Sequence, residues 1–381
     1  MAEIKNLKKA AQRIKKAVKN KEKIVLYGDS DLDGMASVII LKESIRNLGG
    51  EISAVYFPDR ESEGYGLNEA ALDYLKPQAP ALLIVMDCGI GNFTEVKLAK
   101  KLGFEVLILD HHKPLGKLPQ ASIVVNLWQK GDKYPFKEFA AAGLIFKLSE
   151  ELLAGKNSNS LRNNLLELAG LATLADMMPQ IEDNLAIISE GLISLAKTSR
   201  PGLKVFYKIS NFEEQKQIFQ RIISACHAGD TKDHINEGYL LLTETSSVKA
   251  EELAKSLLER AILRQQLVRE ITLQAEAKIL DNLHEPLVFQ GDPSWPVLML
   301  GPVASRLVQN YQKPIFLYSQ KNSHCQGAVR TPKGVDGVKA MQHCAKLLDT
   351  YGGHPQAAGF KVLNKNLEKF KECLIQYFKK L

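Results

Sequence analysis

Cysteine is scarce in this chain of 381 residues, and its five cysteines are Cys88, Cys226, Cys325, Cys344 and Cys373. Their number is odd and none of them forms a C-x-x-C pair. This pattern argues against a disulfide framework and against a structural zinc site. We therefore expect five reduced thiols.

Long apolar runs are also missing. The longest, at 81–87 and 104–110, are far shorter than the ~20 residues that a membrane-spanning helix needs. The N-terminus is rich in lysine but has no apolar stretch before a small-residue cleavage site, which argues against a secretory signal. Internal repeats and low-complexity segments are absent as well. We expect a globular protein of the cytoplasm with two domains and no membrane segment.

The formal net charge of +7 is concentrated at the N-terminus, because residues 1–23 hold nine Lys or Arg and only two Glu. Five apolar residues recur there at spacings of three and four: Ile4, Leu7, Ala11, Ile14 and Val18. This spacing predicts an amphipathic helix whose apolar stripe docks on the protein body. Its basic face is either a contact for nucleic-acid phosphates or a solvated surface, and the sequence leaves both readings open.

From residue 24 onwards, short apolar runs alternate with helical patterns, which is typical of an α/β fold with a parallel sheet. The expected strands are 24–28, 52–57, 81–87, 104–110 and 122–127. The expected helices are 138–155, 161–175, 184–198 and, long and charged, 248–281. A second run of expected strands comprises 286–289, 295–300, 314–319 and 327–331.

These patterns predict four segments. They are a basic helix at 1–23, a parallel-sheet α/β domain at 24–200, a helical linker with the long helix at 201–282, and a smaller α/β domain at 283–381. In open parallel sheets, ligands bind at the carboxyl ends of the strands. The residues that directly follow each expected strand are therefore the first candidates for a site.

Three carboxylates follow the first expected strand in the turn GDSDLDG: Asp29, Asp31 and Asp33. Their mutual repulsion is costly unless a cation neutralises them, and hard divalent metals prefer such oxygen ligands. The alternative is a calcium loop of the EF-hand type, but that loop needs a helix before it and a Glu about twelve residues from its start. Since a strand precedes this turn, we favour a metal site at the sheet edge.

Acids and imidazoles also follow the third and fourth expected strands. Asp87 ends the third in MDCG, while Asp110, His111 and His112 follow the fourth in LDHHKP. A histidine pair alone is weak evidence, but convergence of several strand ends on one crevice favours a metal site. A mixed Asp and His shell suits manganese or magnesium, and two such ions suit phosphoryl transfer.

At this point the chain resembles a known family. GDSDLDG, MDCG, LDHHKP and the later LADMMP resemble, in order, the four motifs of the DHH superfamily of phosphoesterases. FPDRESEGYGLNEAAL at 57–72, AAAGLIFKL and LAGLATLADMMP resemble the RecJ family in particular. GAVRTPKGVD and YGGHPQAAGF at 351–360 resemble its associated DHHA1 domain. The resemblance covers residues 24 to about 365.

The resemblance implies a two-ion centre for Mn²⁺ or Mg²⁺. Its implied ligands are Asp31, Asp33, Asp87, His111 and Asp176, with Asp29 ligating or supporting them. Asp87, His111 and His112 would be catalytic, with Asp87 bridging the ions and His112 facing the scissile phosphate. Asp110 would orient a neighbouring imidazole. Composition alone would make Asp176 an ordinary turn acid, so the resemblance decides its assignment.

The resemblance also implies contacts to substrate phosphates. In the second domain they would come from Arg330, Gly352, Gly353 and His354, with Arg306 as a further candidate. Arg60 is a candidate for holding a terminal phosphate, and a solvated surface arginine is the alternative. For Tyr65, stacking on a base and packing of its own loop are the alternatives, and we favour packing.

The implied function is a metal-dependent exonuclease on single-stranded DNA, acting from 5′ to 3′ and releasing mononucleotides in DNA repair or recombination. One alternative is a DHH phosphodiesterase for short oligoribonucleotides, bisphosphorylated adenosine nucleotides or cyclic dinucleotides. Tyr27 and Asp29 argue against it, since those smaller enzymes typically present His and Asn there. A catalytically silent nucleic-acid-binding scaffold is a further alternative, which the intact acids and histidines disfavour.

The chain departs from the family pattern in three places, one of them at 295–307, which lacks the usual Gly-Ile-Val. The segment 221–230 lacks the arginine that RecJ proteins usually carry there and has Ser224 and His227 instead. No OB-type domain follows YGGHPQAAGF, which predicts lower processivity.

Overall fold

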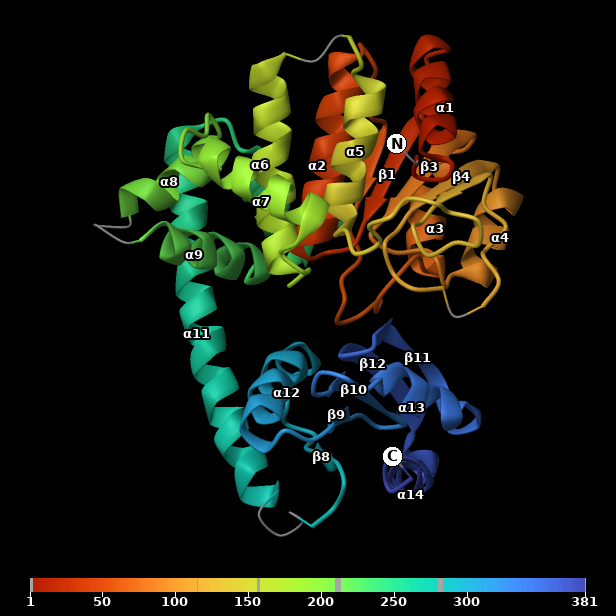
Figure 1. Ribbon diagram of the computed structural model, residues 1–381, viewed down its shortest axis with the longest axis vertical. Coiled ribbons are helices and arrows are strands. Elements are labelled where there is room, and N and C mark those ends of the chain that lie inside the picture. Colours follow the sequence, from red (N-terminus) through yellow and green to blue (C-terminus); the bar gives the residue numbers. More distant parts are fainter. Residues whose placement is uncertain (1–2, 115, 156–157, 210–213, 280–283, 381) are drawn as a thin grey trace. The chain divides into compact units, whose positions relative to one another are not determined.

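The computed structural model describes residues 3–114, 116–155, 158–209, 214–279 and 284–380. The chain divides into two compact units, residues 1–261 and 262–381 (Figure 1). Each unit has its own five-stranded sheet and its own hydrophobic core. The predicted α/β fold, with a parallel sheet in the first part and a smaller α/β part after a long helix, is confirmed.

The first sheet is entirely parallel and has the order β2-β1-β3-β4-β5. Its strands are β1 (Ile24–Gly28), β2 (Ala54–Tyr56), β3 (Ala81–Met86), β4 (Phe104–Leu109) and β5 (Ile123–Val125). Each lies within one of the predicted ranges. Because the strands are parallel, the residues that follow them meet at one edge of the sheet.

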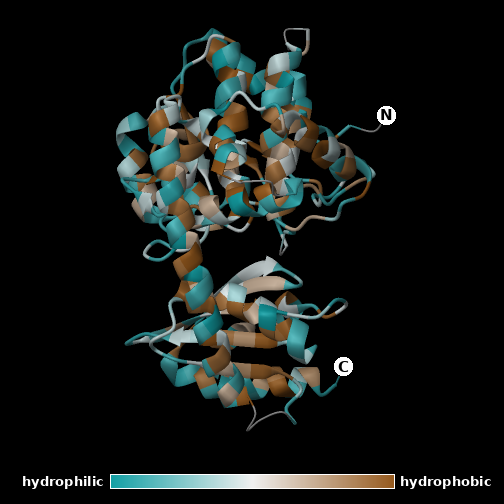
Figure 2. Cartoon of the chain, turned by 90° about the vertical axis from the view of Figure 1, so that its left-hand side faces the viewer, coloured by the Kyte–Doolittle hydropathy of each residue, from teal (hydrophilic) through white to brown (hydrophobic). Residues whose placement is uncertain are grey.

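Helices cover both faces of this sheet. Along β1, Ile24 and Leu26 point into one core, whereas Val25 and Tyr27 point into the other. The first face carries α1 (Leu7–Lys19), α2 (Leu32–Asn47), α5 (Ala141–Leu152) and α6 (Asn159–Ala175), with α7 (Glu182–Leu195) packed on α6. The second carries α3 (Glu69–Leu75), which runs into the 3-10 turn η1 (Lys76–Gln78), and α4 (Phe93–Lys101). Burial on both faces explains the continuous apolar runs of the strands (Figure 2).

The basic N-terminal helix docks as predicted. Ile4 and, in α1, Ala11 and Ile14 are buried, and Leu7 and Val18 pack against the same core. The lysines of α1 are exposed. The helix thus presents a lysine-rich outer surface over an apolar seam, and whether that surface contacts nucleic acid stays a prediction.

The segment 201–261, which the sequence analysis assigns to a helical linker, contributes to the first core. Its elements are α8 (Pro201–Ile209), α9 (Gln215–His227), the hairpin β6 (Thr231–Lys232) and β7 (Ile235–Asn236), α10 (Glu237–Thr243) and the start of α11 (Ser247–Ile279). Phe206, Ile222 and Leu241 are fully buried there. The predicted long helix at 248–281 corresponds to α11, and its last two residues lie outside the described residues.

The second sheet has the order β11-β12-β10-β9-β8. Its strands are β8 (Val288–Gly291), β9 (Ile315–Gln320), β10 (His324–Arg330), β11 (Leu348–His354) and β12 (Ala357–Leu363). β8 and β9 pair in parallel and the other neighbours pair antiparallel. The helices are α12 (Val297–Tyr311), α13 (Gly337–His343) and α14 (Leu367–Phe378), with 3-10 turns η3 (Ala345–Leu347) and η4 (Asn364–Asn366).

The predicted strand at 295–300 is wrong, because this segment begins helix α12. The buried side chains of α12 are those of Met299, Leu300, Val303, Ala304 and Leu307. They recur at helical spacing over more than two turns, whereas a six-residue apolar run alone does not separate strand from helix. The helical period only becomes visible when the window is extended past residue 300.

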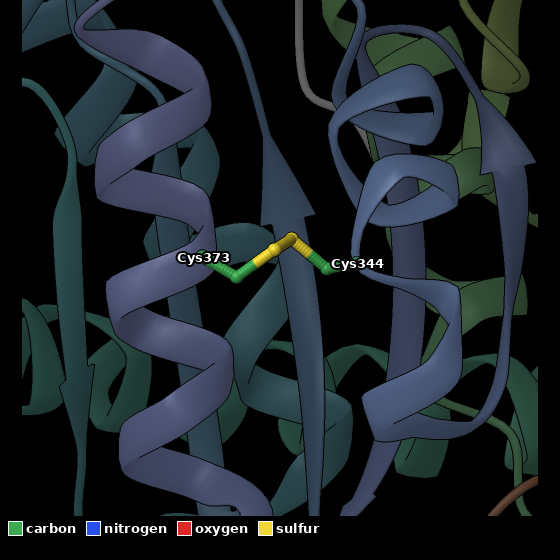
Figure 3. Close-up of a disulfide and its surroundings, with 2 residues drawn as sticks. All are labelled: Cys344 and Cys373. Carbon is green, nitrogen blue, oxygen red and sulfur yellow. A yellow bond between two sulfur atoms is a disulfide. The ribbon is translucent and has the colours of Figure 1, made fainter.

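The expectation of five reduced thiols is wrong for two cysteines. Cys344, directly after α13, forms a disulfide with Cys373 of α14 (Figure 3). The two are 29 residues apart in sequence with β11 and β12 between them, and packing of α13 against α14 brings them together. Neither the count nor the local spacing of cysteines carries that tertiary information. Cys88, Cys226 and Cys325 are free and buried.

None of the helices in the described part of the chain is both long enough and apolar enough to cross a membrane.

Candidate metal centre

The turn after β1 is built around the start of helix α2. Asp31 is the N-cap of α2, and its Oδ1 accepts a hydrogen bond of 3.0 Å from the backbone N–H of Gly34. A side chain at Gly34 would collide with the turn, since the carbonyl oxygen of Asp29 lies 2.3 Å from the position of a Cβ atom. Capping and close backbone packing therefore hold the carboxylates of this turn at the carboxyl end of β1.

Asp33 is fixed by a second helix. Its carboxylate oxygens accept hydrogen bonds of 2.7 Å from the backbone N–H groups of Ala141 and Ala142, at the start of α5. The N-terminus of a helix stabilises negative charge. Burial nevertheless raises the pKa of Asp33 well above its ordinary value, and the nearby carboxylates of Asp176 and Asp31 raise it further.

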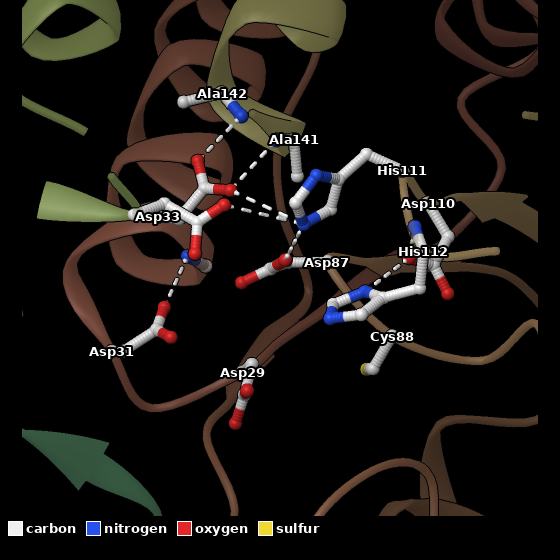
Figure 4. A network of polar contacts seen from close by, with 12 residues as sticks. Asp29, Asp31, Asp33, Asp87, Cys88, Asp110, His111, His112, Ala141 and Ala142 are labelled. Carbon is white, nitrogen blue, oxygen red and sulfur yellow. Dashed lines mark hydrogen bonds and ion pairs between the residues drawn. The ribbon is translucent and has the colours of Figure 1, made fainter. Parts of the chain in front are cut away.

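His111 presents one ring nitrogen to three acids. Its Nδ1 lies 2.8 Å from the carbonyl oxygen of Phe139, which can only accept, so the proton belongs on Nδ1. In the neutral imidazole, Nε2 then carries the lone pair that can bind a metal ion. It lies 3.2 Å from Oδ1 of Asp87, 3.6 Å from Oδ2 of Asp176 and 3.8 Å from Oδ2 of Asp33 (Figure 4). Four electron-rich atoms at these distances repel one another unless a cation lies among them.

The carboxylates around His111 fit divalent cations. Oδ1 of Asp87 and Oδ2 of Asp176 are buried without a hydrogen-bond partner among the described residues. Burial, reinforced by the neighbouring acids, raises the pKa of Asp87 well above its ordinary value and that of Asp176 to about 7. Asp87 also has a left-handed backbone with φ of 62°, a conformation that a non-glycine residue holds only when its surroundings impose it.

Two groups of residues, both entirely within the first unit, each have ligand atoms that lie within 4.8 Å of one another. One joins Asp33, Asp87 and His111, and the other joins Asp29, Asp31 and Asp87. Because Asp87 belongs to both groups, it can bridge two ions. An all-oxygen set beside a mixed oxygen and imidazole set suits hard divalent ions such as Mn²⁺ or Mg²⁺.

His112 is held by Asp110. Oδ1 of Asp110 lies 2.8 Å from Nδ1 of His112 and accepts a 3.0 Å hydrogen bond from its backbone N–H. The side chain of Asn126, directly after β5, donates to the carbonyl oxygens of both residues at 2.8 Å. Although burial opposes both charges, their attraction lowers the pKa of Asp110 to about 2 and raises that of His112 to about 9. The carboxylate of Asp110 therefore favours the imidazolium form of His112.

The loop 57–68 brings a second cation to the site. The guanidinium of Arg60 donates from Nε to Oδ1 of Asp29 at 2.9 Å and from Nη2 to Oδ2 of the same residue. Nη2 also donates to Oδ2 of Asp31 at 2.9 Å. Burial opposes the charged form of Asp31, but the positive charge of Arg60 nevertheless holds the pKa of Asp31 below its ordinary value.

Tyr65 of the same loop reaches the centre as well. Its hydroxyl donates to the carbonyl oxygen of Asp87 at 3.0 Å and lies 3.2 Å from Nδ1 of His112. The side chain is 53% exposed. The sequence favours packing of the loop for this tyrosine, whereas the structure places it on the rim of the metal centre.

The structure thus brings together all the first-unit candidates: Asp29, Asp31, Asp33, Arg60, Asp87, Asp110, His111, His112 and Asp176. Sequence reasoning missed Asn126, although its place directly after a strand is a signal. It also missed the carbonyl oxygen of Phe139 and the N–H groups of Ala141 and Ala142. These are backbone atoms, and because almost every residue type has them, the sequence does not identify them.

The candidates of the second unit gather around one strand of its own sheet. Ala357 in β12 pairs with Arg330 on one side and with His354 on the other. Nε of Arg330 donates to Oγ of Ser305 at 3.1 Å, and no carboxylate of the described residues forms an ion pair with this guanidinium. Burial lowers its pKa. A half-buried cation without an acid suits an anionic ligand.

The Gly-Gly pair is only half explained by sterics. Gly353 has φ of +126°, and a Cβ atom there would lie 2.5 Å from the carbonyl oxygen of Ala357. At Gly352 a Cβ atom would meet nothing within 4 Å. Gly353 is therefore required by the hairpin itself. Arg306 lies exposed on α12.

Two family models match the chain. The DHH family, N-terminal domain, matches residues 23–173, and the DHHA1 domain matches residues 284–380. The single-stranded-DNA-specific exonuclease RecJ of Bacillus subtilis is 34% identical over 98% of this chain and 48% of its own length. The chain spans about half the length of the curated relatives it matches.

Solved structures agree with this likeness. A crystal structure of RecJ in complex with Mn²⁺ from Thermus thermophilus has a TM-score of 0.84 and 25% identity, over 99% of this chain and 55% of that chain. A crystal structure of exonuclease RecJ bound to manganese has a TM-score of 0.78 and 26% identity, over 100% of this chain and 96% of that one. With both domains and all four motifs in order, the chain belongs to the DHH family and is RecJ-like within it.

Proposed function

We propose that this chain is a metal-dependent exonuclease that hydrolyses phosphodiester bonds in single-stranded DNA. The observation that carries the proposal is the lone pair of His111 facing Asp33, Asp87 and Asp176, beside the second group around Asp31. The likeness to RecJ exonucleases supports the substrate class.

Two ions of Mn²⁺ or Mg²⁺ would be held by Asp31, Asp33, Asp87, His111 and Asp176. When bound, such a pair lowers the pKa of water and stabilises negative charge on the phosphate. The protein positions these ligands through the helix starts of α2 and α5 and through the left-handed backbone at Asp87. Backbone N–H groups also anchor the carboxylates of Asp31 and Asp33.

His112 and the second unit would bind the substrate. The imidazolium of His112, oriented by Asp110, carries a proton that can be donated to a phosphate oxygen. Arg330, Gly352, Gly353 and His354 would contact phosphates further along the strand, and Arg306 is a further candidate.

The finer points of the proposal follow the family. They are digestion from the 5′ end, release of mononucleotides, a role in DNA repair or recombination, and the cytoplasm as compartment. The rival substrates are short oligoribonucleotides, bisphosphorylated adenosine nucleotides and cyclic dinucleotides.

The test is digestion of single-stranded DNA labelled separately at each end, duplex DNA, di- to pentaribonucleotides, a bisphosphorylated adenosine nucleotide and a cyclic dinucleotide, with Mn²⁺ or Mg²⁺. We expect metal-dependent mononucleotide release from the 5′ end of the single strand. Asp87→Asn should abolish it. Asp73→Asn, the same substitution at an exposed position of α3, should not.

Each other outcome selects a different function. Cleavage confined to the ribonucleotides or the small nucleotides would move the assignment to a small-molecule phosphodiesterase. Absence of hydrolysis with every substrate, while the metal still binds, would favour the silent scaffold.

A further inference from the structure

Asp29 lies beside the metal centre, but its carboxylate is occupied by an arginine. We propose that Asp29 is a positioning residue that aims Arg60 at a phosphate of the substrate, and that it is not a metal ligand. This inference rests on the proposed function, since it assigns a role toward a nucleic-acid phosphate at the same site.

The lone pairs of Asp29 are largely used. A carboxylate offers about four acceptor positions on its two oxygens. Oδ1 accepts from the backbone N–H of Ser30 at 2.8 Å and from Nε of Arg60 at 2.9 Å, and Oδ2 accepts from Nη2 of Arg60. The two bonds from Arg60 form a parallel fork along one edge of the carboxylate. Asp29 is 1% exposed, so water does not compete for this pair.

Asp29 is also set apart from the acids that face the imidazole. Asp33, Asp87 and Asp176 have oxygens between 3.2 and 3.8 Å from Nε2 of His111, and Asp29 is absent from that group. In Figure 4 its carboxylate points away from the cluster. Its strongest contact among the described residues is the cation of Arg60.

The loop that carries Arg60 is built to hold the guanidinium in place. The carboxylate of Glu63 accepts from the hydroxyl of Tyr56 at 2.7 Å and from the backbone N–H of Asp59 at 3.1 Å. The hydroxyl of Tyr27, from β1, donates to the carbonyl oxygen of Gly66 at 2.7 Å. With the loop tied at both ends, the fork to Asp29 sets the direction of the guanidinium.

An arginine placed in this way suits a phosphate. One edge of the guanidinium is used by Asp29, and the side chain remains 35% exposed at the rim of the site. Its Nη2 lies 2.9 Å from Oδ2 of Asp31, so a phosphate on the guanidinium is a neighbour of the one over the metals. Since Nε and Nη2 donate to Asp29 and Asp31, the N–H groups of Nη1 are the donors for a phosphate oxygen.

The rival role for Asp29 is metal ligation, since its oxygens lie within 4.8 Å of those of Asp31 and Asp87. Asp29→Asn and Asp31→Asn make a matched pair, because they remove the same charge from the same turn. Manganese stoichiometry, measured by calorimetry and by electron paramagnetic resonance, separates the roles. We expect two ions for wild type and Asp29→Asn, and fewer for Asp31→Asn. One ion lost in Asp29→Asn would overturn the proposal.

A second experiment tests the phosphate contact by measuring binding. Its ligands are short single-stranded oligodeoxynucleotides that carry a 5′-phosphate, a 3′-phosphate or neither, with phosphorothioate linkages against hydrolysis. We expect wild type to prefer one terminal phosphate by about tenfold or more, as for one charge-assisted hydrogen bond. Arg60→Ala and Asp29→Asn should each abolish that preference, and the double variant should lose no more than either. A full preference in Asp29→Asn, or none in wild type, would overturn the proposal.

The two proposals can fail separately. A preference for the 3′-phosphate that needs Asp29 and Arg60 would keep the positioning role and overturn digestion from the 5′ end. Hydrolysis of single-stranded DNA with an unaltered preference in Asp29→Asn would keep the exonuclease and overturn the positioning role. Manganese binding by each variant also reports that the chain has folded.

Discussion

Nε2 of His111 lies 3.2 Å from Oδ1 of Asp87, and in the neutral imidazole it has no proton to donate, because Nδ1 holds the proton that faces the carbonyl oxygen of Phe139. With Asp87 ionised, the two atoms repel each other unless they share a cation. His111→Gln should therefore lower Mn²⁺ affinity by at least about 100-fold, the upper end of what even an outer partner of a ligand costs. Calorimetric titration measures this loss, and His284→Gln, at an exposed histidine, is the control. Equal affinities of the two variants would contradict the assignment.

Asp110→Asn should alter the pH dependence of hydrolysis. The carboxylate of Asp110 raises the pKa of His112 to about 9. Without that charge the pKa of His112 falls, so the imidazolium is lost at lower pH. We expect activity to drop by about 10–100-fold and its alkaline limb to move to lower pH. A pH–rate profile with an unchanged alkaline limb would exclude His112 as the proton-carrying group.

Protein stripped of metal by a chelator should lose stability as the pH rises. The pKa of Asp176 is about 7 in the folded chain, against an ordinary value of about 4. Folded chains then hold a proton that unfolded chains release, so the stability from this group declines from about pH 4 to pH 7 and is lost above its folded pKa. In chelator, the melting temperature of Asp176→Asn should change less with pH across this range than that of wild type. Parallel curves for the two proteins would refute the linkage.

Gly353→Ala should destabilise the second unit. The backbone there has φ of +126°, and the new methyl would lie 2.5 Å from the carbonyl oxygen of Ala357. A strained backbone of this kind costs about 1–3 kcal/mol. Gly352→Ala, where the methyl meets nothing within 4 Å, is the matched control and should melt like wild type. Thermal denaturation followed by circular dichroism compares them.

Reduction should weaken the second unit through Cys344 and Cys373. A bridge across 29 residues restricts the unfolded chain, and the chain-entropy model gives about 3–4 kcal/mol for such a loop. Denaturant unfolding with and without dithiothreitol should reveal this difference in wild type. Cys344→Ala should be insensitive to the reductant. Mass spectrometry after thiol alkylation, showing five free thiols in untreated protein, would contradict the bridge.

The first sheet and most of its candidate site could be predicted from the sequence, because most of the candidate residues closely follow a strand. Asp29, Asp87 and Asp110 each follow a buried apolar run directly, and parallel pairing gathers them. Asp176 follows a helix, α6, and no pattern distinguishes it from any other acid after a helix. Only the resemblance of LADMMP to the last of the four DHH motifs identified Asp176 as a candidate.

The remaining contacts depend on tertiary packing. The N–H groups of Ala141 and Ala142 bind Asp33 because α5 is packed against α2, more than 100 residues later in the chain. The paired hydrogen bonds between Arg60 and Asp29 also depend on tertiary packing, because other hydrogen bonds hold the loop 57–68 in place. The family resemblance implied a phosphate contact for Arg60 and said nothing of its carboxylate partner.

The order of the ligands along the chain has a consequence for biosynthesis. As the chain leaves the ribosome, Asp31, Asp33 and Asp87 emerge first, then His111, and Asp176 emerges only at the end of α6. The N–H groups that anchor Asp33 also belong to a later helix. The nascent sheet therefore carries a group of unneutralised acids, and Arg60, which emerges between Asp33 and Asp87, is the first cation able to offset them. The full set of proposed metal ligands is therefore present only after residue 176 has emerged, when residues 177–261 of the first unit are still to follow.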